Sequence, residues 1–423
     1  MKTSEKLRIA WFSPLNIGAE KSPSVSAYAS DQLLPLLADR FEIELYHAGF
    51  DRYQNFPTYH YLSAFARHRA KPYDFFFYQL EDLKSSHFIR VHMGLMPGVV
   101  WFHDFIFSSF GPEPILNSPW RQVVDKFHNA ALDWPKRGAE LDQFGPLGYR
   151  EGAWSVVPLF SSPVALSEYR RNITARLDSS SGFFVPTPVP SRRIEPQAHT
   201  GFTVGFCGSP HIEDRAPKAL LALQDLSSYH LLWLIAESER AQAQALLAEF
   251  DITSVTLLTE RTPDKWREVT RSCDCAIHTL FSVYGQPDPY LGASLMAGVP
   301  SIVTRFGATE YLPENVVFKV DAGDHEAVEI REVLRAVQAR KVPAVGERSR
   351  ELALELYSSE QVAFELSCVF ERCAPQLARF AERWQAFEQS SAADLISEAP
   401  GYVAQPSDWE LLMKPTFEEF GWK

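Results

Sequence analysis

The order of apolar and polar residues divides the first half of the chain into short apolar runs that alternate with amphipathic segments. The runs FFFYQL (75–80) and GVVWFH (98–103) are apolar almost without interruption, which is typical of parallel strands buried on both faces. We expect further strands at 7–12, 42–46, 163–167 and 182–185, and helices at 25–38, 119–134 and 146–160. This alternation predicts βαβ units around a parallel sheet.

The same rhythm restarts in the second half. We expect strands at 202–208, 230–236, 254–258, 275–280, 300–304 and 316–320, and helices at 216–226, 238–250 and 263–271. A helix of small residues ends at Gly298, which closes it without a Cβ penalty, and Pro300 prevents its continuation. From about 325 the pattern is helical, with a long helix at 360–388 and an aperiodic, aromatic-bearing tail at 394–423.

Residues 186–200, PTPVPSRRIEPQAHT, are the clearest linker, because they hold four prolines and no apolar periodicity. We therefore predict an α/β fold with two doubly wound, Rossmann-like domains at 1–190 and 201–358. A long helix that crosses back and the tail would occupy 359–423. In such sheets ligands collect outside the carboxyl ends of the strands, so a site is expected in the cleft where the two domains face each other.

Composition and charge narrow the class of protein. Hydrophobic residues make up 46% and charged residues 22% of the chain, as in soluble globular proteins. The net charge of −12 argues against general affinity for nucleic acid or anionic lipid. The five cysteines show no metal-type spacing, and no segment resembles a membrane span or a signal peptide. We expect a cytoplasmic protein without a metal, and leave open a peripheral contact with the inner face of the membrane.

Specific strings resemble a known family. Two such domains joined by a Pro-rich linker resemble the GT-B architecture, and the motifs resemble family 4 (group 1) glycosyltransferases. Residues 78–104 read YQLEDLKSSHFIRVHMGLMPGVVWFHD against a branch pattern YQLGN…H.FI…PGVVVLHD, with Glu81 and Asp82 in place of Gly-Asn. ALSEYRR (165–171), MAGVPSIV (296–303) and YLPENVVFKV (311–320) also match the branch.

The resemblance implies a retaining transferase that uses a nucleotide-diphosphate sugar as substrate and needs no cofactor. The first domain would bind the acceptor, which would be a glycan, a lipid-linked sugar or a protein, as in polysaccharide biosynthesis. The second domain would bind the nucleotide-sugar. The base, the sugar, the acceptor and the oligomeric state stay open.

His103 and Asp104 are the catalytic candidates. His103 ends a buried strand, where a neutral imidazole can bind a sugar hydroxyl, and the resemblance implies that it faces the transferring sugar. The alternative is a His–Asp pair that only organises the turn.

The donor-binding candidates lie in loops that lead into helices, where unpartnered amides can bind phosphate oxygens. Arg215 and Lys218 would neutralise the diphosphate, unless they are two solvated charges. The full set is Gly18, Gly208, Ser209, Arg215, Lys218, Ser282, Tyr284, Gly285, Gln286 and Asp288.

Two departures from the family keep another function open. Ser209 stands where the family has an arginine, and no carboxylate stands where it has a pair of glutamates; Asp288 is the nearest acid. The second hypothesis is therefore a catalytically silent GT-B protein that binds a glycan, a nucleotide or a partner enzyme. A sugar-nucleotide epimerase is a third.

Two further groups of residues are interpreted as structural rather than catalytic. The basic run Arg67, His68, Arg69 and Lys71 is expected to be a solvated face, with contact to an anionic acceptor or membrane as the alternative. Glu168 and Tyr169 are expected to open and cap a helix.

Overall fold

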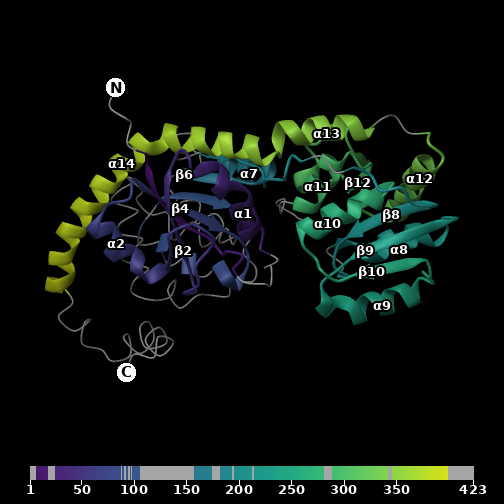
Figure 1. Ribbon diagram of the computed structural model, residues 1–423, viewed down its shortest axis with the longest axis horizontal. Helices are drawn as coiled ribbons and strands as arrows, with labels where there is room; N and C mark the ends of the chain where they lie inside the picture. The colour runs from purple at the N-terminus through teal and green to yellow at the C-terminus, as the bar shows by residue number, and fades with distance from the viewer. Residues whose placement is uncertain are drawn as a thin grey trace.

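The protein contains two fully parallel sheets (Figure 1), as seen in a computed structural model. The structure describes residues 6–17, 24–86, 88–89, 92–93, 96, 98–104, 157–173, 182–192, 195–211, 214–280, 288–341 and 345–398. The first sheet has the order β3-β2-β1-β4-β5-β6-β7 and the second has the order β10-β9-β8-β11-β12-β13. We call the parts built on these sheets the first and the second domain.

All strands except β3 and β6 fall close to the predicted apolar runs. The first sheet comprises β1 (Arg8–Phe12), β2 (Glu42–His47), β3 (Thr58–His60), β4 (Phe75–Leu80), β5 (Val99–Phe102), β6 (Val157–Phe160) and β7 (Phe183–Phe184). The second comprises β8 (Phe202–Cys207), β9 (Tyr229–Leu234), β10 (Val255–Leu258), β11 (Cys275–His278), β12 (Ser301–Thr304) and β13 (Phe318–Val320).

Helices cover both faces of each sheet. They are α1 (Val25–Leu37), α2 (Ala64–Ala70), α7 (Pro163–Ile173), α8 (Ala216–Gln224), α9 (Arg240–Glu249), α10 (Pro263–Val269), α11 (Pro289–Ala297), α12 (Glu326–Gln338), α13 (Val345–Leu356) and α14 (Ser359–Glu398). In the first domain, Phe77 and Trp101 point into a core shared with α1 and α14, while Phe76 and Val100 point into a core with α2 and α7. Successive strand residues point to opposite faces, so an uninterrupted apolar run fills both cores.

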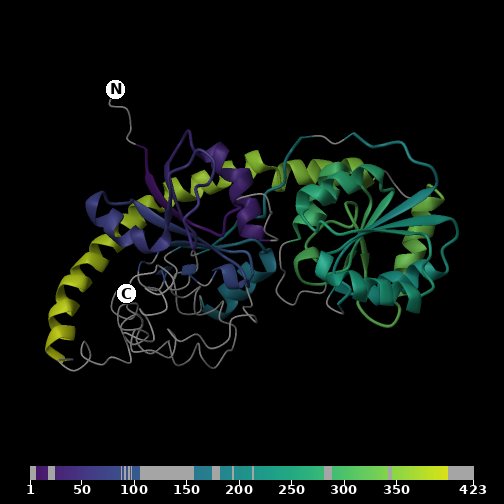
Figure 2. The same ribbon diagram turned by 60° about the horizontal axis from the view of Figure 1, so that its bottom comes forward.

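The C-terminal helix α14 lies along the first domain although it follows the second domain in sequence, as both views show (Figure 2). Phe370 of α14 packs against Phe41, Phe75 and Phe77, with ring centroids 5.0–5.5 Å apart. The helix continues to Glu398, so the prediction of an aperiodic tail from 394 is wrong for its first five residues; 399–423 lie outside the described residues.

The predicted end of α11 is confirmed. Gly298 is the C-cap residue with a left-handed φ of 73°. A Cβ on Gly346 of α13 would lie 2.1 Å from the carbonyl oxygen of Gly298, so both positions depend on glycine.

Two predictions before the linker are wrong. Residues 157–160 form strand β6 instead of the end of a helix, and 163–167 begin helix α7 instead of forming a strand. The cause is Ser162-Pro163, since Ser162 Oγ accepts a hydrogen bond from the backbone N–H of Ala165 at 3.3 Å and proline suits the first helical position. Tyr169 therefore lies within α7 and packs on Phe160, and Glu168 caps no helix start.

Each sheet changes its winding direction once, between β1 and β4 in the first domain and between β8 and β11 in the second. Ligands of doubly wound sheets bind at such switch points. Among the described helices, none combines the length and the apolar character needed to cross a bilayer.

Candidate functional site

A pocket opens where residues of the two domains meet. It encloses about 670 Å³, including space open to solvent. Ser161 follows β6 of the first domain, while His278 ends β11 and Phe306 follows β12 of the second, so the walls are built from the carboxyl ends of both sheets. Thr187 of the linker and Tyr357 at the end of α13 complete the pocket on the side of the chain connections.

His103 lies beneath this pocket rather than in its wall. Its residue surface is 2% exposed, Nε2 lies 2.8 Å from Gln79 Oε1, and Nδ1 lies 3.1 Å from Ser161 Oγ. Burial lowers the pKa of His103 to about 3, so the imidazole is neutral. Asp104 instead accepts a hydrogen bond from the backbone N–H of Asp82 at 2.7 Å.

Arg215, one of the two predicted phosphate-binding cations, is engaged inside the second domain. It precedes α8 with a left-handed φ of 54°, and its guanidinium binds both carboxylate oxygens of Glu326, whose side chain is fully buried. Lys218 is half-buried and makes no ion pair among the described residues. Of the predicted pair, Lys218 is the one without an ion pair in the described part of the chain.

The turn after β8 holds the candidates Gly208 and Ser209. Backbone groups of this turn are hydrogen-bonded to other side chains of the protein. The backbone N–H of Ser209 donates to the carboxylate of Asp214, and Gly208 accepts from the Trp233 indole at 2.9 Å. A Cβ on Gly208 would lie 2.9 Å from the Phe206 ring, so the turn packs tightly on the strand.

Asp288 is the N-cap of α11. Its Oδ1 accepts from the N–H groups of Tyr290 and Leu291 at 2.9 and 3.0 Å, and Oδ2 lies 3.1 Å from His278 Nδ1. Burial raises the pKa of Asp288, but His278 and these amides outweigh it and keep the pKa below its usual value. For the described start of α11 the expectation of open amides is wrong, because Asp288 fills them and Pro289 has no N–H; the loop amides at 281–287 lie outside the described residues.

The candidates Gly18, Ser282, Tyr284, Gly285 and Gln286 lie outside the described residues. The pocket as described is formed by strand ends, α11, the segment after β12 and the linker, and among the described donor-binding candidates Asp288 is the one that lines it.

In the first domain, Glu81 is the buried carboxylate that caps a helix, as Asp288 does in the second domain. It follows β4 at the switch point, is 2% exposed, and accepts hydrogen bonds from Ser24 Oγ and from the N–H groups of Val25 and Ser26 at the start of α1. Burial raises the pKa of Glu81 to about 7. The chain's own carboxylates thus fill described amides at the switch points of both domains.

Sequence reasoning missed several residues of the pocket, Ser161, Thr187 and His278 among them, and the nearby cation Arg261. Ser161 was hidden because 146–160 was read as a helix; with β6 assigned, Ser161 is the first residue past a strand's carboxyl end. Arg261 follows β10, and its guanidinium lies 3.6 Å from a carboxylate oxygen of both Asp214 and Glu239, with 27% of its side chain exposed. A cation just past a predicted strand end was the signal that could have found it.

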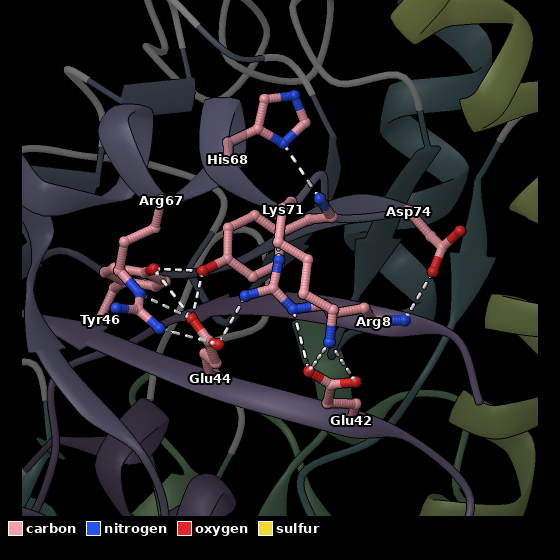
Figure 3. A network of polar contacts seen from close by, with 9 residues as sticks. Arg8, Glu42, Glu44, Tyr46, Arg67, His68, Lys71 and Asp74 are labelled. Atoms are coloured by element: carbon pink, nitrogen blue, oxygen red, sulfur yellow. Dashed lines mark hydrogen bonds and ion pairs between the residues drawn. The ribbon is translucent and has the colours of Figure 1, made fainter. Parts of the chain in front are cut away.

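The basic run has a structural role that neither interpretation foresaw. Arg67 binds Glu44 through two hydrogen bonds, Lys71 binds Glu42, and His68 Nδ1 accepts from the backbone N–H of Tyr73. Arg67 and Lys71 therefore hold α2 and the segment after it to β2, while His68 ties α2 to that segment (Figure 3).

The arrangement of the two domains is similar to that of solved structures of other proteins. No protein-family profile matches the chain, and no curated protein matches its sequence. Among solved structures, sucrose-phosphate synthase from Thermosynechococcus elongatus aligns with a TM-score of 0.63 and 13% identity over 87% of this chain and 99% of that one. Anabaena HepE, in complex with UDP-glucose, aligns with a TM-score of 0.60 and 12% identity over 86% and 100%. A glycosyltransferase from Rickettsia africae aligns at 0.58 and 10% identity over 87% and 98%.

The chain has the GT-B fold. Two parallel α/β domains, followed by C-terminal helices, match these structures over nearly their full length, which confirms the fold class predicted from the sequence. At these identities the likeness concerns the fold, and the function has to be argued from the site.

Proposed function

We propose that the protein is a glycosyltransferase that moves a sugar from a nucleotide-diphosphate sugar to a glycan, glycolipid or glycoprotein acceptor. The observation that carries the proposal is the pocket between the carboxyl ends of the two sheets, with the buried, neutral His103 bonded to its wall at Ser161. HepE, which shares the fold, was determined with UDP-glucose and also with UDP and glucose. A ligand of that kind at the corresponding edges would span both domains.

The donor diphosphate would lie against the second domain. Arg215 is committed to Glu326, so the charge available there comes from Lys218 and from the partly exposed Arg261. The 3.6 Å separations of Arg261 from Asp214 and Glu239 are longer than close ion pairs, so in this proposal its N–H groups exchange these contacts, and those with Cys207 and Tyr290, for phosphate oxygens.

The proposed reaction retains the anomeric configuration and needs no metal or resident cofactor. The acceptor oxygen forms its bond to the anomeric carbon on the face from which the phosphate oxygen departs. The departing phosphate oxygen takes the proton of the acceptor hydroxyl. No protein base is required in this scheme. The facing domains would exclude water and so limit hydrolysis of the donor.

The experiment combines the purified protein with UDP-, GDP- and dTDP-sugars and measures thermal shift, nucleotide release and transfer to an acceptor panel. We expect binding and transfer with at least one donor, unchanged by EDTA. His103→Ala should lower transfer and leave nucleotide binding largely intact, because His103 belongs to the first domain and reaches the pocket through Ser161. Full transfer by this variant would contradict the role given to His103.

A second candidate function is a silent GT-B protein that binds a glycan or a partner enzyme. The observation that favours it is the set of internal carboxylates, in which Glu81, Asp214 and Asp288 fill amides that a phosphate would otherwise use. Binding of nucleotide-sugars without turnover across the acceptor panel would favour this function over transfer.

A further inference from the structure

Six buried polar side chains form a continuous row of hydrogen bonds across the first domain. They are Trp11, Ser30, Ser13, Gln79, His103 and Ser161, and each residue is at most 7% exposed. Successive members lie within 2.7–3.3 Å of one another. Ser161 is the member that lines the pocket. The direction of each hydrogen bond in the row therefore decides what Ser161 offers to a ligand.

The row has a fixed direction at its inner end. The Trp11 indole can only donate, and it donates to Ser30 Oγ at 3.2 Å. Ser30 donates to Ser13 Oγ at 3.1 Å, and Ser13 donates to the carbonyl oxygen of Pro14 at 2.7 Å, a group that can only accept. The protons of both serines are thus already used.

Gln79 must therefore turn its amide nitrogen to the serines, which lie 2.7 and 3.3 Å from Nε2. Its carbonyl oxygen then faces His103 Nε2 at 2.8 Å, so Nε2 carries the single proton of the neutral imidazole. Nδ1 is left as an acceptor, and the hydroxyl of Ser161 donates to it at 3.1 Å.

We propose that Ser161 binds a hydroxyl group of an uncharged saccharide in the pocket, as an acceptor whose own proton is turned inward to His103. Gln79 and His103 are positioning residues that fix this polarity. The proposal rests on the proposed function for the choice of a saccharide as the ligand class, but it holds for a silent glycan-binding protein as well.

Thr187 supports the assignment. It lines the same pocket, is 4% exposed, and its hydroxyl has no hydrogen-bond partner among the described residues. Buried hydroxyls without partners are costly unless a ligand or water completes them. The ionisable side chains His278 and Asp288 in the wall already bind each other, His278 also binds Ser294, and Asp288 also caps α11. The groups left over are hydroxyls, which suit a sugar better than a phosphate.

Two measurements test the proposal on the full chain. Nitrogen-15 NMR of the His103 imidazole should place its proton on Nε2, and Gln79→Leu should shift part of the population to the other tautomer. Ligand-observed NMR with free glucose, galactose and mannose, with and without UDP, should detect a bound hexose. Ser161→Ala should weaken that binding about five-fold, as expected for one lost hydrogen bond.

Ser162→Ala is the matched control, because Ser162 is buried beside Ser161 but caps α7 without touching His103. It should lower Tm and leave hexose binding unchanged. Unaltered binding in Ser161→Ala, a His103 proton on Nδ1, or no hexose bound by the wild type would each overturn the proposal. Hexose binding without sugar transfer would support the Ser161 subsite and contradict the proposed transferase function.

Discussion

Arg215 and Glu326 form a buried ion pair between the start of α8 and the start of α12, with 17% and 0% of their side chains exposed. Arg215 adopts its left-handed backbone conformation in this arrangement. The pair holds α8 against α12. Arg215, which the sequence predicted as a phosphate-binding cation, is therefore bound to Glu326.

The first prediction separates Arg215 from Lys218. Arg215→Ala should lower the free energy of unfolding by about 3 kcal/mol, because it leaves the Glu326 carboxylate buried without its counter-ion. Lys218→Ala should change stability little and weaken nucleotide binding. Urea unfolding and calorimetric titration with UDP measure both effects; a Lys218 variant that is strongly destabilised would contradict the assignment.

The second prediction concerns Glu44, which lies at the centre of the network in Figure 3. Burial raises the pKa of Glu44, but hydrogen bonds from Arg67, Tyr73 and Arg8 outweigh it and hold the pKa at about 2. Since the unfolded value is about 4.3, the ionised carboxylate stabilises the protein above pH about 4.3, and this contribution is lost as the pH falls toward 2.

Glu44→Gln should therefore cost about 2–3 kcal/mol at neutral pH and flatten the acid limb of the unfolding curve. Glu42→Gln is the control, because Glu42 has 45% of its side chain exposed and its ion pairs are screened by water. Equal losses in the two variants would show that burial of Glu44 does not set its contribution.

The third prediction is that the contribution of Glu81 to stability changes with pH in the direction opposite to that of Glu44. Burial raises the pKa of Glu81 to about 7, so the folded protein binds a proton that the unfolded chain has released between pH about 4.3 and 7. The stability contributed by the protonated form is complete below pH about 4.3 and is lost as the pH rises through 7. Asp104 lies near enough to raise the pKa further.

Glu81→Gln keeps an acceptor for the α1 amides without the charge. It should match the wild type at pH 4.5 and be more stable by about 3 kcal/mol at pH 8. Thermal unfolding across this range measures the difference. A gap that stays constant with pH would contradict the assignment of this titration to Glu81.

The fourth prediction tests Asp288 as a helix cap. Asp288→Ala should cost about 1–2 kcal/mol, because the N–H groups of Tyr290 and Leu291 lose their acceptor. Asp288→Asn should recover most of this, since asparagine caps as well as aspartate. If the asparagine variant kept its stability but lost nucleotide binding, Asp288 would have the donor-binding role first expected for it.

The errors of sequence reasoning have local causes. At residues 157–167 the apolar character of VPLF and PVAL is similar, so periodicity alone did not separate strand from helix. The Ser162-Pro163 start signal lay between them. Strand β3 and helix α2 were missed because they have three and seven residues, too few to show a period.

The sequence by itself determined most of the parallel strands and the end of α11, because apolar runs, prolines and glycines act on their own neighbourhoods. Only the tertiary structure decided which polar groups are left for a ligand. His103 meets Gln79 and Ser161 from 24 and 58 residues away, and Arg215 meets Glu326 from 111 residues away. Such partners depend on the order of strands in a sheet, and local patterns carry no record of that order.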